Sequence, residues 1–264
     1  MAASPFSIED KVAIVTGGGV GIGKSIALEF ARAGADVVIA SRKLENLEPV
    51  TAEIRKLGRR SFCVALDVRQ EDQVKALVER TVEEMGRLDV MVNNAGASFR
   101  AKVEDISANG WNTVVGINLN GTFFGCKWAG KRMLDQGAGV IINISSIAGV
   151  YGSTMMSHYG AAKAAVITLT RELGMAWGRK GVRVNCIAPG PVETEGYLGV
   201  LTKQDPSAAK KAYDTVATRV GMGRWGKVEE IAYPCIFLAS AASSFMNGET
   251  IVIDGGAPPQ LGDG

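Results

Sequence analysis

The sequence predicts a single doubly wound α/β domain. Seven short apolar runs alternate with longer segments whose apolar residues recur every three or four positions, and a glycine-rich turn follows the first run. The 264 residues are 47% hydrophobic and 21% charged, and no Pro-, Gly- or Ser-rich linker, repeat or low-complexity segment divides them. Because α/β folds of this length often form one unit, we expect residues 1–264 to form one domain with a large core.

The seven apolar runs are the expected strands of a parallel sheet. Their apolar side chains are mostly continuous rather than alternating, which is typical of parallel strands buried on both faces. They span Val12–Val15, Val37–Ala40, Phe62–Leu66, Val90–Asn93, Val140–Ile144, Val182–Ile187 and Thr250–Ile253. Between them the apolar period is that of helices, which we expect to cover both faces of the seven-stranded sheet and to leave ligands beyond the carboxyl ends of the strands.

The region from about residue 195 to residue 225 interrupts this alternation, and we interpret it as a substrate-binding lid. An apolar pocket with a basic rim would suit an acyl thioester with a phosphorylated carrier, although an amphipathic surface helix fits the pattern equally well. The residues in question are Met155, Met156, Tyr197, Leu198, Leu201, Met222 and Trp225, with Lys203, Lys210 and Lys211.

Charge and composition favour a small-molecule substrate. The net charge of +2 comes from 29 basic and 27 acidic residues spread along the chain, so we expect no nucleic-acid or membrane partner. The start, MAASPFSIEDK, is not a secretory signal, and the final GDG is not a peroxisomal address, so a cytoplasmic location is expected. The four cysteines lie far apart without metal-ligand spacing, so we expect reduced thiols and no metal site.

A glycine-rich turn, TGGGVGIG from Thr16 to Gly23, lies between the first expected strand and an amphipathic helix. Glycines there permit a tight turn and close approach of a phosphate, and the helix start offers free N–H groups. The common GxGxxG pattern fails in every frame, whereas TGxxxGxG fits with Gly17, Gly21 and Gly23. At the start of a βαβ unit this turn predicts a bound dinucleotide, and we assign Ile22 with the three glycines to its binding.

Ser41 and Arg42 stand near the position where an acidic residue would bind the ribose 2′-hydroxyl of NAD. A guanidinium there suits a 2′-phosphate through its charge and its planar fork of donors. The sequence therefore predicts NADP(H), with NAD(H) as the less favoured alternative if Arg42 is only a solvated loop charge.

Six motifs together resemble the short-chain dehydrogenase/reductase family. They are TGGGVGIG, NNAG at residues 93–96, NLNGTF from Asn118, NISS ending at Ser146, YGAAK from Tyr159 and NCIAPGPVET from Asn185. Each motif is weak alone, but six in this order, between about Lys11 and Gly256, are specific. The resemblance implies a Rossmann-like fold and an NAD(P)-dependent oxidoreductase.

The resemblance also implies the site residues. The family's catalytic Asn, Ser, Tyr and Lys match Asn118, Ser146, Tyr159 and Lys163, here called the tetrad, and the family's serine-to-tyrosine spacing selects Ser146 over Ser145. Tyr159 and Lys163 also count as cofactor-binding residues, with Lys163 on the nicotinamide ribose. The remaining cofactor positions are Asp67 and Val68 beside the adenine, Asn94, Ala95 and Gly96 along the cofactor, and Pro189, Gly190, Val192 and Thr194 at the nicotinamide amide.

Tyr159 and Lys163 lie four residues apart on an expected helix, so their side chains leave the same face one turn apart. An ammonium beside the phenol favours phenolate, so we expect the pKa of Tyr159 to fall toward the working pH. In the reduction direction, Ser146 and Tyr159 would bind the carbonyl oxygen and Tyr159 would donate the proton. By resemblance, Asn118 serves a water-mediated proton relay from Lys163.

The substrate stays open at this point. The segments PGPVETEG and VVIASRKLENL resemble the branch that reduces the C=C bond of enoyl- and dienoyl-CoA, but that branch commonly replaces the tyrosine. The presence of Tyr159 favours carbonyl/alcohol chemistry on 3-oxoacyl thioesters, sugars, steroids or simple ketones. A non-catalytic NADP(H)-binding sensor is a further alternative, disfavoured because Tyr159 and Lys163 are both present.

His158, the only histidine, directly precedes Tyr159. It is rotated by about 100° around the expected helix, so we expect it to line the pocket or cap the helix rather than transfer the proton. The family commonly forms tetramers through long helices, and residues 112–133 and 159–178 are long enough for this, so a homotetramer is expected.

Overall fold

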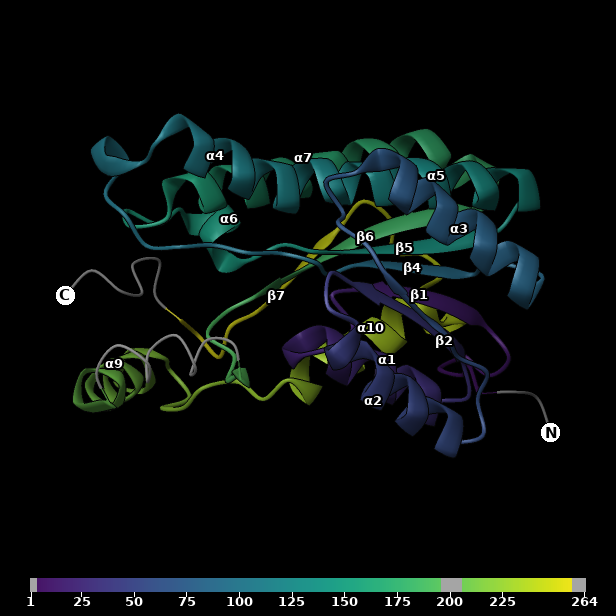
Figure 1. Cartoon of the computed structure of the whole chain (residues 1–264), viewed down its shortest axis with the longest axis horizontal. Coiled ribbons are helices and arrows are strands. Elements are labelled where there is room, and N and C mark those ends of the chain that lie inside the picture. Colours follow the sequence, from purple (N-terminus) through teal and green to yellow (C-terminus); the bar gives the residue numbers. More distant parts are fainter. Residues whose placement is uncertain (1–3, 196–205, 258–264) are drawn as a thin grey trace.

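The computed structural model describes residues 4–195 and 206–257, which contain one seven-stranded parallel sheet (Figure 1). The order of its strands is β3-β2-β1-β4-β5-β6-β7, and every neighbouring pair is parallel. The strands are β1 (Val12–Thr16), β2 (Asp36–Ser41), β3 (Cys63–Ala65), β4 (Val90–Asn93), β5 (Gly139–Ile144), β6 (Val182–Pro189) and β7 (Thr250–Ile253). The predicted doubly wound fold and its seven strands are confirmed.

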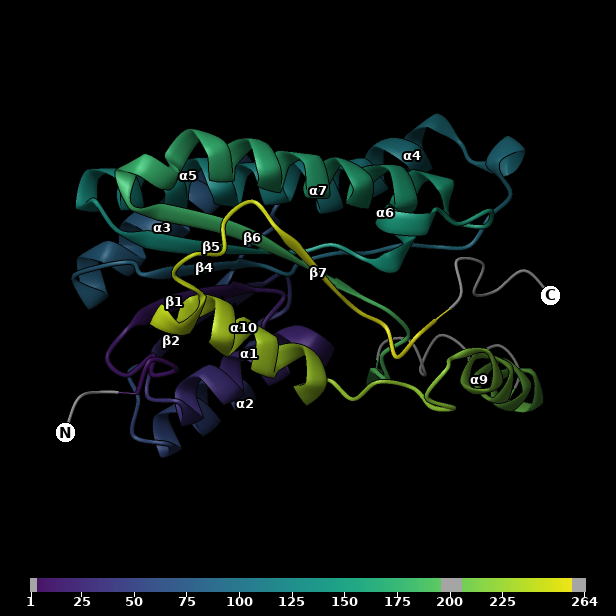
Figure 2. The same cartoon turned by 180° about the vertical axis from the view of Figure 1, so that it is seen from behind.

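Helices form a layer on each face of the sheet (Figures 1 and 2). One layer consists of α1 (Gly21–Arg32), α2 (Leu44–Lys56) and α10 (Glu229–Ala239), and the other of α3 (Glu71–Met85), α5 (Gly121–Gln136) and α7 (Ser157–Trp177). The remaining helices, α4 (Ala108–Val115), α6 (Ile147–Tyr151) and α9 (Pro206–Arg219), lie at the end of the molecule toward which the strands point.

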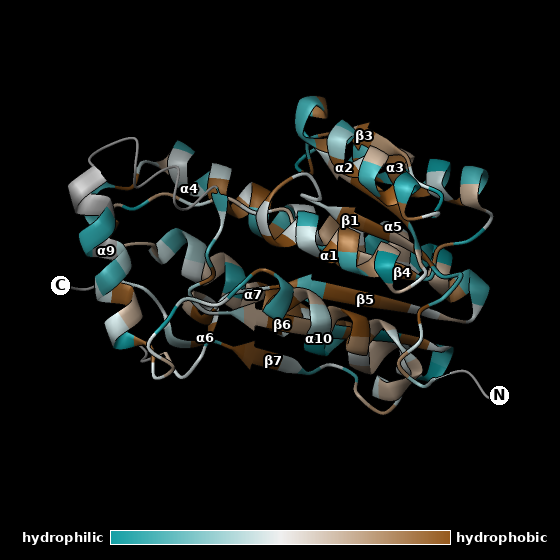
Figure 3. Ribbon diagram, turned by 90° about the horizontal axis from the view of Figure 1, so that it is seen from below, coloured by the Kyte–Doolittle hydropathy of each residue, from teal (hydrophilic) through white to brown (hydrophobic). Residues whose placement is uncertain are grey.

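The continuous apolar runs become strands because both of their faces are buried. In β1 the side chains alternate between two core clusters: Ala13 and Val15 pack under α1 and α10, whereas Val12 and Ile14 pack under α3 and α5. All five residues of β1 are buried. Figure 3 shows the apolar strands enclosed by helices whose outer sides are largely hydrophilic. No helix in the described ranges is both long and apolar enough to cross a membrane.

The strand order places the turn after β1 beside the segment after β4, since these two strands are neighbours in the sheet. The chain continues from β1 to one side of the sheet and from β4 to the other, and such a switch point is where α/β folds bind ligands. The glycine-rich turn and NNAG therefore meet at one edge.

The expected lid is described only in part. Tyr197, Leu198, Leu201 and Lys203 lie outside the described residues. In the described part, the ring of Trp225 stacks on that of Tyr213, with centroids 5.2 Å apart, and Trp225 Nε1 donates to the Tyr213 carbonyl. A parallel bridge between Val192 and Gly226 joins this region to the segment after β6.

Candidate active site

The turn after β1 consists mainly of glycines, so it presents mostly backbone atoms. Gly17 and Gly21 have φ values of +69° and +55°, which favour glycine. A Cβ atom on Gly17 would lie 2.8 Å from Asn94 Nδ2, and one on Gly23 would lie 2.2 Å from the Gly17 carbonyl oxygen. Side chains are therefore excluded where the first turn of α1 presents its N–H groups, as a phosphate cradle requires.

Thr16 and Asn94 join this cradle to the segment after β4. The Thr16 hydroxyl donates to the Val92 carbonyl at 3.2 Å and accepts from the backbone N–H groups of Asn94 and Ala95 at 3.0 and 3.1 Å. Asn94 Nδ2 donates to the Thr16 carbonyl at 2.9 Å. Thr16 is a site residue that was not predicted from the sequence, although it begins the TGGGVGIG motif.

Ser146, Tyr159 and Lys163 are brought together at the carboxyl end of β5. The Ser146 hydroxyl, at the start of α6, accepts from the Ala148 N–H at 3.1 Å and lies near enough to the Tyr159 phenol on α7 to act to lower its pKa. Lys163 Nζ donates to the Ile144 carbonyl at 2.7 Å and lies 5.6 Å from the centroid of the Tyr159 ring. Ser145, the rejected alternative, instead donates to the Lys163 carbonyl at 2.8 Å and so fixes the backbone of α7.

Asn118 occupies a π-helical turn, Gly116–Asn120, between α4 and α5. Such turns are frequent at functional sites. Its Nδ2 donates to the Ala97 and Val114 carbonyls at 2.7 and 2.9 Å, whereas its fully buried Oδ1 has no partner among the described residues. A Cβ on Gly96 would lie 2.8 Å from Asn118 Oδ1 and 3.5 Å from Lys163 Nζ, so both polar atoms lie beside Gly96.

Burial controls the ionisation of Tyr159 and Lys163. It raises the pKa of Tyr159 above its usual value of 10.0, and the hydrogen bond from Ser146 opposes this. It also lowers the pKa of Lys163 to about 8. The expectation that Lys163 lowers the pKa of Tyr159 is therefore wrong in direction. Both groups are desolvated, and Nζ lies over the phenol ring while donating to Ile144.

The positions predicted for the adenine end lie beyond β2 and β3. Ser41 ends β2, and Arg42 follows it in an exposed position. Arg69 donates from Nε to both carboxylate oxygens of Asp67, at 3.0 and 2.9 Å. These bonds, and more weakly the charge of Arg42, hold the pKa of Asp67 below its usual value. Val68 is buried against the start of α5.

The predicted nicotinamide segment follows β6. Pro189 is the last residue of β6, and the Gly190 N–H donates to the Ile253 carbonyl at 2.8 Å. Thr194 side-chain carbons lie 3.4 Å from where a Cβ on Gly21 would be, so this segment reaches the glycine turn. Ile22 is partly buried against the core under α1. The predicted cofactor residues thus border one edge of the sheet.

Among the described residues, His158 forms no hydrogen bond with the tetrad, although it directly precedes Tyr159. Its side chain is fully buried and caps no helix end, since α7 begins without a side-chain cap. The alternative that His158 caps the helix is therefore wrong.

The fold and the site define an NAD(P)-dependent dehydrogenase or reductase. Bare glycines at a helix start fit a dinucleotide phosphate, and a phenol paired with a serine hydroxyl fits the transfer of a proton to or from oxygen. Beside Gly96, the unpartnered Asn118 Oδ1 offers a further buried acceptor.

Known proteins support this class. A family described as enoyl-(acyl carrier protein) reductase matches residues 18–258. The chain is 40% identical to a peroxisomal 2,4-dienoyl-CoA reductase of Danio rerio, over 96% of this chain and 83% of the relative. It is 38% identical to the 3-oxoacyl-(acyl carrier protein) reductase of Thermotoga maritima, over 94% and 98%.

A solved structure agrees. A protein from Beutenbergia cavernae, described as an NAD(P)-dependent gluconate 5-dehydrogenase with NADP bound at low occupancy, superposes with a TM-score of 0.87. It is 35% identical, with 96% of this chain and 98% of that chain covered. The chain therefore belongs to the short-chain dehydrogenase/reductase family. It is an NAD(P)-dependent oxidoreductase that acts on CH–OH and C=O groups.

Proposed function

We propose that this protein interconverts a ketone and a secondary alcohol with NADP(H), and that Tyr159 is the acid/base. The observation that carries the proposal is the convergence of three groups: the Tyr159 phenol, the Ser146 hydroxyl that acts to lower its pKa, and buried Lys163, whose Nζ lies 5.6 Å from the centroid of the Tyr159 ring. Two hydroxyl groups at one point form a binding site for a carbonyl oxygen.

The side chains of the tetrad divide the work of reduction. When bound, the nicotinamide supplies hydride to the carbonyl carbon. Ser146 and Tyr159 donate hydrogen bonds to the carbonyl oxygen, and Tyr159 then gives its proton to the developing alkoxide. The raised pKa of Tyr159 keeps the phenol protonated and ready for this step. Lys163, cationic below its pKa of about 8, stabilises the phenolate that remains.

Asn118 is assigned to returning a proton to Tyr159 through Lys163 and water. Its Oδ1 is buried, lacks a partner and shares the space beside Gly96 with Lys163 Nζ. Lys163 would also hold the nicotinamide ribose. The main chain of Gly17, Gly21 and Gly23 would hold the phosphates, with Ile22 beside them.

The preference for NADP(H) rests on Arg42. Because Arg69 engages both oxygens of Asp67, the exposed guanidinium of Arg42 is available for a 2′-phosphate. The NADP bound in the Beutenbergia cavernae structure is consistent with this preference. Replacing Ser41 by Asp together with Arg42 by Ala should lower the NADP-to-NAD ratio of kcat/KM. An unchanged ratio would reject the assignment.

The experiment that tests the reaction is NADPH consumption with a panel of ketones and a panel of enoyl- and dienoyl-CoA esters. The account predicts turnover of ketones, sugar ketones or 3-oxoacyl thioesters. Selective turnover of the CoA esters would favour the C=C reductase, as in the Danio rerio relative. Tight NADPH binding without turnover of either panel would favour a sensor.

We also propose a homotetramer in the cytoplasm, acting on a small molecule. A groove of about 290 Å³ lies between α5 and α7, the two long helices expected to meet a second copy. Its lining is mainly apolar, with Phe123, Leu134, Leu173 and Trp177, and carries three charges, Lys127, Lys131 and Asp135. Light scattering should give four chains per particle, and Phe123→Asp should dissociate them.

A further inference from the structure

Three polar atoms without partners gather at the start of α7. They are Ser157 Oγ and both ring nitrogens of His158, Nδ1 and Nε2, and none has a hydrogen-bond partner within the described ranges. The His158 side chain is 0% exposed. Buried polar groups in folded proteins are almost always paired, so this cluster requires an explanation. Tyr159 is the next residue, so the cluster borders the proposed active site.

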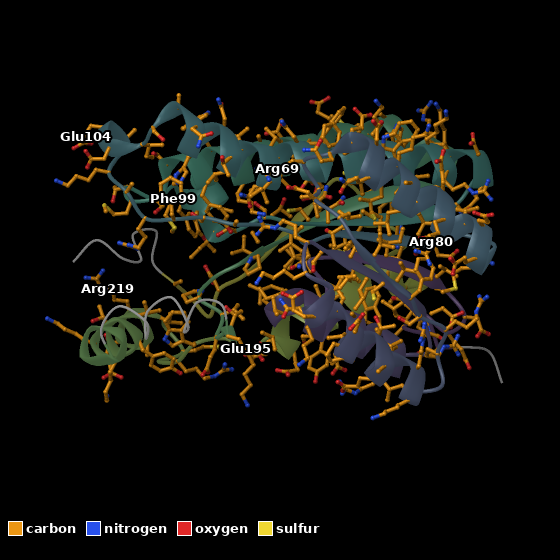
Figure 4. The ribbon with its side chains drawn as sticks, in the orientation of Figure 1. Arg69, Arg80, Phe99, Glu104, Glu195 and Arg219 are labelled. Atoms are coloured by element: carbon orange, nitrogen blue, oxygen red, sulfur yellow. The ribbon has the colours of Figure 1, made fainter. Side chains whose placement is uncertain are left out.

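Phe99 separates His158 from solvent. The two rings meet edge to face, with centroids 4.3 Å apart. Phe99 is itself 42% exposed, so one of the groups that cover His158 faces solvent. Phe99 lies two residues after Ala97, whose carbonyl accepts from Asn118 of the tetrad. Figure 4 shows Phe99 on the loop that faces α9, with Arg219 projecting toward the same loop.

The segment that carries Phe99 can move without breaking the sheet. Residues 94–100 form no helix or strand. On either side of Phe99 the backbone is held at Ala97, whose carbonyl accepts from Asn118, and at Ala101, whose N–H donates to the Met155 carbonyl at 2.9 Å. The Phe99 ring also packs at Gly110, where a Cβ would lie 2.9 Å from its Cζ. If the Phe99 ring turned away from Gly110 and His158, His158 would lose one of the groups that cover it, and no backbone hydrogen bond of α7 would need to change.

The chemistry of His158 suits a hydroxyl group. Burial lowers the pKa of His158, which keeps the imidazole neutral at neutral pH. A neutral imidazole has one N–H donor and one acceptor nitrogen, and a hydroxyl group both donates and accepts. A carboxylate would leave the acceptor nitrogen unpaired.

We propose that His158 is a specificity-determining residue that hydrogen-bonds a second oxygen of the substrate, a hydroxyl, when Phe99 moves aside. The substrate class is then a hydroxyketone rather than a plain ketone. His158 and Tyr159 point about 100° apart around α7, which places their polar atoms on the order of 10 Å apart. The hydroxyl is therefore several bonds from the reacting carbonyl. This inference rests on the proposed ketone reduction.

The test compares 2-octanone with methyl ketones that carry a hydroxyl at increasing distance from the carbonyl, each reduced with NADPH. Wild-type protein should show one chain position at which the hydroxyl raises kcat/KM by about tenfold or more. His158→Leu should abolish that preference while keeping kcat/KM for 2-octanone within about twofold. Its melting temperature should stay equal or rise, because unpaired buried polar atoms are removed. His158→Gln, which restores a donor and an acceptor, should recover part of the preference.

A matched control is Thr51→Val. Thr51 is also buried with an unpartnered side-chain oxygen, but it lies on α2, on the opposite face of the sheet. This change should leave the hydroxyketone preference intact. The proposal is overturned if no hydroxyketone is preferred, if His158→Leu keeps the preference, or if it lowers all activities together with the melting temperature, as a structural role predicts. If no ketone of the panel is reduced with NADPH, the proposed function is rejected, and with it the inference about His158.

Discussion

Buried polar side chains at the two ends of the parallel sheet differ in their hydrogen bonding. At the amino end, Asp36 accepts from Arg59 and Arg60, and Asp89 accepts from Arg87 and from the Val12 N–H at 2.9 Å. At the carboxyl end, Asn118 Oδ1, Ser157 Oγ and both nitrogens of His158 have no partner within the described ranges.

This difference in hydrogen bonding distinguishes residues that stabilise the fold from residues that bind a ligand. A paired carboxylate at a strand start satisfies backbone donors and stabilises the fold. An unpaired polar atom at a strand end destabilises it and is retained where a ligand supplies the partner. Asn93 Oδ1, at the carboxyl end of β4, also lacks a partner among the described residues, although its Nδ2 bonds Asn143. The exception is Thr51 Oγ1, which has no partner in the described part of the chain but lies on α2.

The largest expected effect on stability comes from replacing the buried ammonium at the carboxyl end. Lys163→Met should lower kcat by at least about a hundredfold, since the proton step loses its cation. At pH 7, removing a buried charge whose pKa is lowered from 10.5 to about 8 should raise the free energy of unfolding by about 3 kcal/mol, and the loss of the Lys163 hydrogen bond to the Ile144 carbonyl should offset about 1 kcal/mol or more of that gain.

The size of this gain in the free energy of unfolding depends on pH. Below about pH 8 the folded protein holds Lys163 charged, so the full cost of burial is present, and it disappears as pH rises to 10.5. Urea unfolding of both proteins at pH 7 and pH 10 measures it. If the Lys163→Met protein were less stable than wild type at pH 7, the proposed difference between the amino and carboxyl ends of the sheet would be contradicted.

Removing a carboxylate at the amino end should have the opposite character. Asp89→Ala leaves the Val12 N–H unpaired and Arg87 without its partner, so the free energy of unfolding should fall by about 1–3 kcal/mol. The folded fraction should keep its kcat, because the site lies at the other end of the sheet. Unfolding and initial-rate measurements on one preparation of Asp89→Ala would show the lower stability and the unchanged kcat. A large loss of kcat in the folded protein would argue against a purely structural role for Asp89.

The smallest expected effect is the pH dependence of ketone reduction. Tyr159 stays protonated because its pKa is raised, whereas Lys163 loses its charge near pH 8. We therefore expect kcat/KM for reduction to fall above about pH 8, by less than about tenfold at pH 9. Initial rates across this range at saturating NADPH would test it. A rise above pH 8 would show that deprotonation of Lys163 aids the reaction.

The sequence predicted the fold well for a physical reason. Runs such as Val12–Val15 are apolar at every position, and only a strand buried on both faces explains that. The ends of the strands were less certain: β3 covers only Cys63–Ala65 of the expected Phe62–Leu66, and β6 extends to Pro189. Local side-chain pattern does not determine where ladder pairing stops.

The site was predicted in its residues but not in its electrostatics. The i, i+4 spacing placed Tyr159 and Lys163 together. The direction in which the pKa of Tyr159 shifts depends on burial, however, and spacing does not reveal burial. Likewise, the π-helical turn around Asn118 has no clear signal in NLNGTF, because its extra residue is fixed by packing against Gly96 and Ala97.

The most direct test of the account is Tyr159→Phe, because it removes one hydroxyl oxygen from the carboxyl end and leaves the ring in place. We predict that kcat for ketone reduction falls by about 10²- to 10⁴-fold, while the affinity for NADPH, measured by fluorescence titration, stays nearly unchanged. Retention of more than about a tenth of the wild-type kcat would contradict the assignment of Tyr159 as the acid/base.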